Sequence, residues 1–179
     1  MMRNIVLFGD SMLGQFGTSL IEKVESQVPD VQVHNCATGG ATTKNGLKQV
    51  DYISTLKPDI VVLSFGTNDI FKDKLSPKDY LKNLIKIINS FNKSRIIIWI
   101  TPPANDINDV DGTIKFNKQI SEYNQVVREY CKNNVDFIDS FDDNKISIGK
   151  KDIYHEDDGI HLTDAGYVPF LDSLIRLLS

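Results

Sequence analysis

The chain has 179 residues, of which 41% are hydrophobic and 25% are charged. This length and balance are typical of a globular domain, and they exclude a disordered chain and a disulfide-dependent miniprotein. The formal net charge is −4, from 24 acidic and 20 basic residues. An acidic chain without a basic run is a poor partner for a phosphate backbone, so we expect no nucleic-acid ligand. We expect a single domain over residues 1–179.

Three sequence features bear on where the protein works. Cys36 and Cys131 are too few for a secreted disulfide framework, and they lack metal-ligand spacing. The apolar run Ile5–Phe8 near the N-terminus is too short for a signal peptide. The longest apolar runs fall far short of the ~20 residues of a membrane-spanning helix. We therefore expect a cytoplasmic protein with no membrane span.

Short apolar runs alternate with segments of helical period along the chain. In chain order the sequence predicts strand 4–8, helix 13–27, strand 31–36, helix 44–56, strand 59–65, helix 77–92, strand 95–100, helix 114–133, strand 135–138 and helix 163–178. Ser76 and Thr163 are the predicted N-caps of the third and last helices. Three strands contain continuous apolar, β-branched runs, which are typical of parallel strands buried on both faces.

Five strands that are each followed by a helix form a βαβ series. Such a series predicts a three-layer α/β/α sandwich around a five-stranded parallel sheet. Ligands of these sheets bind at the carboxyl ends of the strands. We therefore expect the chemistry in the loops that follow the strands, at residues 9–13, 37–43, 66–71, 101–113 and 139–161. The last two are long, as functional loops often are.

The residues at these strand ends are those needed for acyl transfer. Ser11 follows the first strand, and a serine hydroxyl needs a base to become a nucleophile. His161, just before the last helix, is the predicted base. Asp158 lies three residues earlier, a spacing that lets a carboxylate reach the far ring nitrogen in a turn. The Ser11 N–H, a glycine N–H and the Asn68 amide are candidate donors to the oxyanion of a tetrahedral intermediate.

This set of residues resembles the SGNH hydrolases, also called GDSL-type esterases and lipases. Ser11 in Gly-Asp-Ser matches the family's nucleophile, and Asn68 in Gly-Thr-Asn-Asp matches its oxyanion asparagine. Gly40 matches the oxyanion glycine, and Asp158 and His161 match the Asp-x-x-His block. The resemblance implies a flavodoxin-like fold, a catalytic Ser11–His161–Asp158 triad and an oxyanion hole of Ser11, Gly40 and Asn68. It also implies a monomer or weak homodimer.

Gly40 is preferred over Gly39 because family members usually place this glycine five residues after an asparagine, here Asn35. The chain departs from the family pattern at Met12, where leucine is common. Asp10 is expected to hold the turn or a neighbouring loop, and Asp69 to order its own loop.

The other histidines and acids have simpler interpretations. His34 is expected to be a packed or edge residue of the second strand. His155 is expected to be a solvated loop residue or a substrate contact. Asp157 is the alternative partner of His161 if Asp158 is not. The cluster from His155 to His161 contains metal-ligand residue types, but no His-Glu-x-x-His helix spacing exists, so we expect no metal and no cofactor.

The sequence thus predicts a serine esterase that forms an acyl-Ser11 intermediate on a small-molecule ester. Short acyl groups, such as O-acetyl on a sugar or small alcohol, are the preferred substrates. Thioesterase or lysophospholipase activity on longer chains, and acyl transfer by the same residues, stay open. A flavodoxin-like module that binds phosphate or flavin is the non-catalytic alternative. Four apolar residues flank the motifs and either line an acyl pocket or belong to the core: Met12, Leu13, Ile70 and Phe71.

Overall fold

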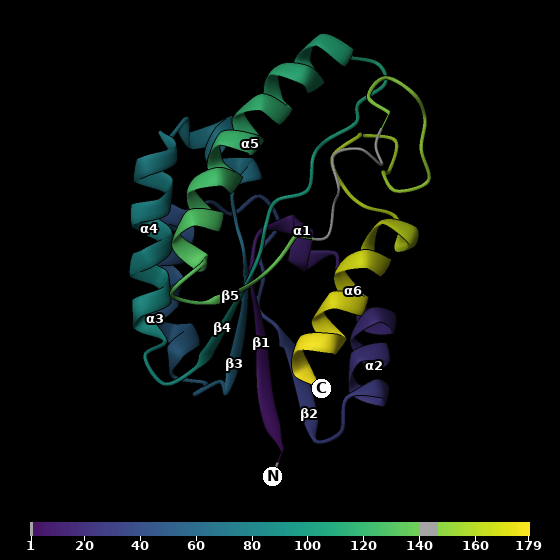
Figure 1. Cartoon of the computed structure of the whole chain (residues 1–179). Coiled ribbons are helices and arrows are strands. Elements are labelled where there is room, and N and C mark those ends of the chain that lie inside the picture. The colour runs from purple at the N-terminus through teal and green to yellow at the C-terminus, as the bar shows by residue number, and fades with distance from the viewer. Residues whose placement is uncertain (1, 140–146) are drawn as a thin grey trace.

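A five-stranded parallel sheet forms the centre of the structure (Figure 1), a computed structural model in which residues 2–139 and 147–179 are described. The strand order is β2-β1-β3-β4-β5, the flavodoxin-like arrangement. This confirms the predicted α/β class. The predicted 139–161 loop lies partly outside the described residues, at 140–146. The strands are β1 (Arg3–Gly9), β2 (Val31–Asn35), β3 (Ile60–Ser64), β4 (Arg95–Trp99) and β5 (Asp136–Ile138).

Helices cover both faces of the sheet (Figure 1). One face packs against α2 (Thr18–Gln27) and α6 (Asp164–Leu178), and the other against α3 (Thr43–Ser54), α4 (Pro77–Ser90) and α5 (Val110–Cys131). Each face therefore buries its own hydrophobic core. Among the described residues, no helix combines the length and apolar character that a membrane crossing requires.

β1 shows why the apolar runs of the sequence are continuous. Ile5 and Leu7 point into the core on the α2 and α6 side, whereas Val6 and Phe8 point into the core on the other side. All four side chains are fully buried. A strand in the middle of a covered parallel sheet has no polar face, so its sequence does not alternate.

The predicted helix over residues 13–27 is wrong near its start. The structure has a short helix α1 (Ser11–Gly14) and a separate α2, with a break between them. The Asn35 side-chain amide donates to the carbonyls of Leu13 (2.8 Å) and Phe16 (3.2 Å) across this break. These tertiary hydrogen bonds satisfy carbonyls that a continuous helix would have used itself.

Two further elements differ from the prediction. The segment Asp69–Asp73, predicted as loop, forms a π-helical turn, η1, whose i→i+5 pattern leaves no periodic signal in a sequence. Helix α5 begins four residues before its predicted start, because Asp109 caps it by accepting from the Gly112 N–H. The predicted N-caps Ser76 and Thr163 are confirmed.

The end of β1 lies tightly against β3. The Asp10 N–H donates to the Ser64 carbonyl (3.0 Å), and a Cβ on Gly9 would lie 2.0 Å from the same oxygen. Only glycine fits there, since real Cβ atoms do not approach an oxygen so closely. The strand-end turn that carries Ser11 is thus held beside the turn that carries Asn68.

Candidate active site

Ser11 and His161 meet at the carboxyl end of the sheet. Ser11 is the first residue of α1, which lies over the upper end of the sheet in Figure 1, and His161 lies just before α6. His161 Nε2 is 2.9 Å from Ser11 Oγ. Both side chains are half-buried. Two segments that lie far apart in the sequence therefore supply a hydroxyl and an imidazole in hydrogen-bonding contact.

Asp158 binds the other side of the His161 ring. Its Oδ2 lies 2.5 Å from His161 Nδ1, and its Oδ1 accepts from the Ile160 and His161 backbone N–H groups, each at 2.9 Å. One carboxylate oxygen thus closes the turn while the other orients the ring. Burial acts to raise the pKa of Asp158, but these hydrogen bonds outweigh it and hold the pKa below its ordinary value.

The contacts between Ser11, His161 and Asp158 are consistent with one placement of the protons. An ionised carboxylate only accepts hydrogen bonds, so Nδ1 of His161 carries the proton toward Asp158. Nε2 of the neutral ring then holds a lone pair that faces Ser11 Oγ–H. This is the arrangement in which an imidazole can remove a serine proton.

The remaining acid and histidine candidates lie elsewhere. The Asp157 side chain is 99% exposed and lies 3.5 Å from Lys151, so Asp158 is the acid that contacts His161. His34 lies half-buried on β2, an edge strand, as predicted. His155 is only 8% exposed, so its interpretation as a solvated loop residue is wrong.

Asp10 connects the Ser11 turn to Asn68. Its carboxyl is 1% exposed, accepts from the Met12 N–H at 2.9 Å and is hydrogen-bonded to the Asn68 side chain. Burial raises the pKa of Asp10 to about 7, against the lowering effect of the Met12 hydrogen bond. Because the Asn68 amide has two N–H groups, one bound to Asp10 leaves the other for a ligand.

Asp69 connects Asn68 to the loop that carries Gly40. It is fully buried, and its carboxylate accepts from both the backbone N–H and the hydroxyl of Thr43. Burial raises the pKa of Asp69 to about 6, although the Thr43 hydrogen bonds lower it. Three residues further along η1, Lys72 Nζ donates to the Gly40 carbonyl at 2.6 Å. The structure thus links Asn68 to Ser11 through Asp10, and Gly40 to Asn68 through η1.

Another Asp-x-x-His segment, residues 152–155, lies just before the one that contains Asp158 and His161. Asp152 Oδ1 accepts from the Tyr154 and His155 N–H groups, and Asp152 Oδ2 lies 3.0 Å from His155 Nδ1. His155 Nε2, in contrast to that of His161, lies 2.9 Å from a backbone carbonyl, that of Pro103. This pair therefore joins the loop after β4 to the loop that carries His161. The repeated spacing was visible in the sequence, but the partner at residue 103 was not.

The thiols and the metal-ligand residue types form no additional centre in the described part of the chain. No group of three or more histidine, cysteine, aspartate or glutamate side chains gathers there in a way that could hold a metal ion. Burial raises the pKa of both thiols, to about 12 for Cys131. Both cysteines therefore stay protonated near neutral pH and are weak nucleophiles.

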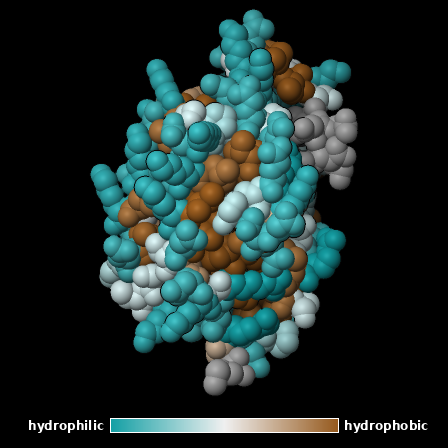
Figure 2. Space-filling view, turned by 60° about the vertical axis from the view of Figure 1, so that its left-hand side comes forward, coloured by the Kyte–Doolittle hydropathy of each residue, from teal (hydrophilic) through white to brown (hydrophobic). Residues whose placement is uncertain are grey.

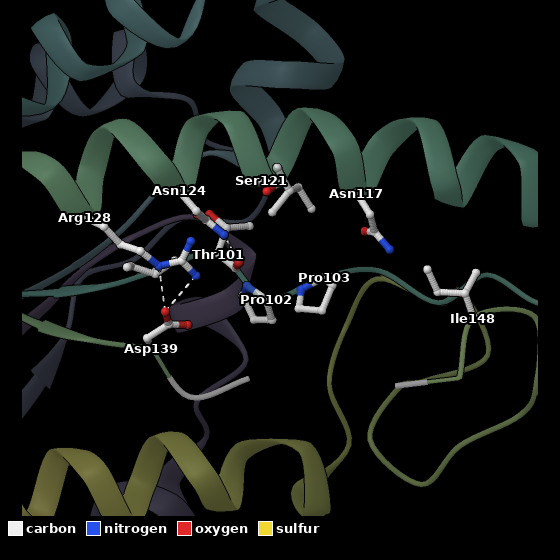
Figure 3. A pocket seen from close by; sticks show the side chains of 11 residues that line it. Thr101, Pro102, Pro103, Asn117, Ser121, Asn124, Arg128, Asp139 and Ile148 are labelled. Carbon is white, nitrogen blue, oxygen red and sulfur yellow. Dashed lines mark hydrogen bonds and ion pairs between the residues drawn. The ribbon is translucent and has the colours of Figure 1, made fainter. Parts of the chain in front are cut away.

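A cavity of about 220 Å³ lies between α5 and the loop after β4 (Figure 3). Its polar groups are largely engaged with one another: Arg128 forms an ion pair with Asp139, and the Asn124 amide donates to the Thr101 carbonyl. Ser11, Asn68 and His161 do not line it. This cavity is therefore separate from the Ser11–His161 contact.

Comparison with known families decides the class. Residues 7–168 match the model of the GDSL-like Lipase/Acylhydrolase family. The chain belongs to this family. It is therefore a carboxylic ester hydrolase. No curated protein matches the chain.

Solved structures of this family share the fold. A lipase/acylhydrolase from Enterococcus faecalis is 27% identical, with a TM-score of 0.84 over 99% of this chain and 95% of that one. A GDSL-like lipase from Bacteroides thetaiotaomicron is 18% identical, with a TM-score of 0.78 over 98% of this chain and 87% of that one. A lipolytic G-D-S-L family protein from Veillonella parvula is 20% identical, with a TM-score of 0.75 over 98% of this chain and 96% of that one.

Proposed function

We propose that this family member is a metal-independent serine esterase in which Ser11 is the nucleophile, His161 the general base and Asp158 its orienting acid. The 2.9 Å contact between His161 Nε2 and Ser11 Oγ carries the proposal. The short Asp158–His161 contact supports it, because it favours the tautomer that accepts the serine proton.

The first half of the reaction acylates the enzyme. Ser11 Oγ attacks the ester carbonyl carbon while its proton passes to His161 Nε2. The carbonyl oxygen becomes an oxyanion that accepts from the Ser11 N–H, the Gly40 N–H and the Asn68 amide. The imidazolium formed at His161 is stabilised by Asp158. The bond to the leaving alcohol then breaks, and the alcohol oxygen takes the proton from His161.

The second half releases the acid. Water attacks the acyl-Ser11 carbonyl as His161 removes one of its protons, and the same donors hold the second oxyanion. The bond from the carbonyl carbon to Ser11 Oγ breaks, and Oγ recovers the proton from His161. The carboxylic acid leaves, and Ser11 and His161 return to their initial states.

The surroundings of Ser11 favour a short acyl group on a polar alcohol. Met12, Leu13 and Ile70, three of the four apolar residues beside the motifs, are packed into the two cores. The turn that carries His161 presents Glu156 and Asp157 to solvent. Carboxylates suit hydroxyl donors such as those of a sugar, and they repel an anionic alcohol.

A groove beside η1 supports longer acyl chains as the second candidate. Phe71, the fourth flanking residue, is 50% exposed, and together with Ile70, Leu75 and Tyr123 it lines a groove of about 300 Å³. Hydrophobic residues reach the surface in a band on the side of α3, α4 and α5, which Figure 2 brings forward. An acyl chain laid along this groove would replace water on apolar surface.

Hydrolysis of p-nitrophenyl esters from acetate to palmitate tests both substrate classes. We expect the highest kcat/KM on acetate or butyrate, and its loss in Ser11→Ala. A maximum at long chains that moves to short chains in Phe71→Ser would instead assign the groove as the acyl site. Retention of the wild-type rate in purified Ser11→Ala would overturn the role of Ser11.

A further inference from the structure

Three side chains of η1 bind the loop before α3 and the first two residues of α3. Lys72 binds the Gly40 carbonyl, Asp69 binds Thr43, and Asp73 lies 3.4 Å from Lys44 Nζ. The π-helical turn follows Asn68 directly, so it joins the two loops that carry the proposed oxyanion donors. Two of these links, those of Asp69 and Lys72, lie on the Gly40–Thr43 stretch itself.

The Lys72 link acts at the proposed donor. Gly40 has a φ of +73°, in the left-handed region, and a Cβ built on it would lie 2.5 Å from Lys72 Nζ. The ammonium group therefore occupies the space directly over the Gly40 backbone. It holds the carbonyl of Gly40 from one side, while the N–H of the same residue is the group expected to face the substrate oxyanion. Glycine allows a wide range of backbone angles, so a bond that fixes the peptide group after Gly40 also restricts the direction of the N–H in the peptide group before it.

We propose that Lys72 is a positioning residue for the oxyanion hole. Its hydrogen bond to the Gly40 carbonyl keeps the Gly40 N–H aimed at the oxygen of the reacting carbonyl. This inference rests on the proposed function, because it takes Gly40 as an oxyanion donor. The Lys72 contact differs from that of Asp69, since Asp69 is fully buried and binds Thr43, whereas Lys72 is exposed and donates to the Gly40 carbonyl.

Donors of an oxyanion hole must be in place before the charge develops, so a loosened donor lowers kcat more than it weakens substrate binding. Lys72→Met keeps the length of the side chain and removes the ammonium. Lys72→Arg keeps a donor able to reach the Gly40 carbonyl. Lys48→Met, on the exposed side of α3, removes one positive charge away from η1 and is the matched control.

We expect Lys72→Met to lower kcat by about 10-fold, less than the roughly 10²–10³-fold cost of deleting a donor, with KM nearly unchanged. Lys72→Arg is expected to recover most of the loss, and Lys48→Met to behave as wild type. The melting temperature should be the same in all three variants. In ¹⁵N NMR spectra, the Gly40 amide should show a lower order parameter in Lys72→Met alone.

The outcomes separate this inference from the proposed function. If the wild type and Ser11→Ala hydrolyse esters equally, the proposed function fails and the role of Lys72 falls with it. If wild-type hydrolysis depends on Ser11 but Lys72→Met keeps its kcat, only the inference on Lys72 is overturned. An unchanged Gly40 order parameter in Lys72→Met also overturns it, whatever the rates. An equal loss of kcat in Lys48→Met would assign the effect to net charge and not to position.

Discussion

The Asn68 side chain is hydrogen-bonded to the buried carboxyl of Asp10, the residue that directly precedes Ser11. Asp10 also caps α1 through the Met12 N–H. A single carboxyl therefore sets both the turn that presents Ser11 and the orientation of the neighbouring amide. Asp10 is in this way a link between two strand ends and not a second acid beside Asp158.

Replacing Asn68 tests the proposed oxyanion hole. Asn68→Ala removes one donor, and we expect kcat to fall by about 10²–10³-fold while KM changes little. The measurement is steady-state hydrolysis of p-nitrophenyl acetate, with circular dichroism to establish that the fold is kept. A wild-type kcat in a folded Asn68→Ala protein would exclude the amide from the oxyanion hole.

Replacing Asp10 tests the link to Asn68. Asp10→Asn replaces one of the two accepting oxygens with an NH₂ donor, so the Met12 N–H and the Asn68 amide must share or compete for the oxygen that remains. We therefore expect a loss of kcat smaller than that of Asn68→Ala, of about 10-fold or more. In the double variant the two losses should not add, since both act on the same amide. Fully additive losses would contradict the link.

Asp10→Asn is also predicted to change how the stability of the protein depends on pH. The pKa of Asp10 rises from 3.8 in a solvated chain to about 7 in the folded protein. A group with a raised folded pKa contributes stability that is complete below about pH 4 and is lost as the pH rises toward about 7. The free energy of unfolding of Asp10→Asn, relative to that of the wild type, should therefore increase as the pH rises from about 4 to about 8. Urea unfolding of both proteins at several pH values measures this difference, and a constant difference would contradict the buried charge.

The sequence predicts the strands well because their burial leaves a direct signature. Val6 and Phe8 alternate with Ile5 and Leu7 between two cores, so the run is apolar throughout. The missed elements depend on tertiary contacts. The break after α1 is stabilised by Asn35, which comes from the second strand and leaves no mark in the helix itself.

The candidate site also has parts that the sequence predicts and parts that depend on tertiary contacts. The Asp-x-x-His spacing predicted that Asp158 would reach His161, and the two are in contact. Which chemistry they perform stays a prediction. His155 carries the same spacing, but its burial depends on the distant Pro103 carbonyl, and the acidic residues beside it gave a misleading impression of a solvated loop. Lys72 offered no signal, because its role depends on the π-helical turn.

His155 is predicted to act on stability. His155→Ala removes the buried ring that joins Asp152 to the Pro103 carbonyl, and losing its two hydrogen bonds costs about 1–3 kcal/mol. The melting temperature should fall by about 2–4 °C for each kcal/mol. His34→Ala, on the edge strand, is the control and should have a much smaller effect. Equal melting temperatures for wild type and His155→Ala would show that the second Asp-x-x-His pair is not structural.

The most direct test of the central claim is to trap the covalent intermediate. The enzyme is mixed with p-nitrophenyl acetate, quenched in acid within the first turnover and digested for mass spectrometry. We predict a burst of p-nitrophenol and one acetyl group on the peptide that contains Ser11, absent in Ser11→Ala. Turnover without a burst or an adduct at Ser11, or an acetyl group that is attached to another residue and is required for hydrolysis, would contradict the account.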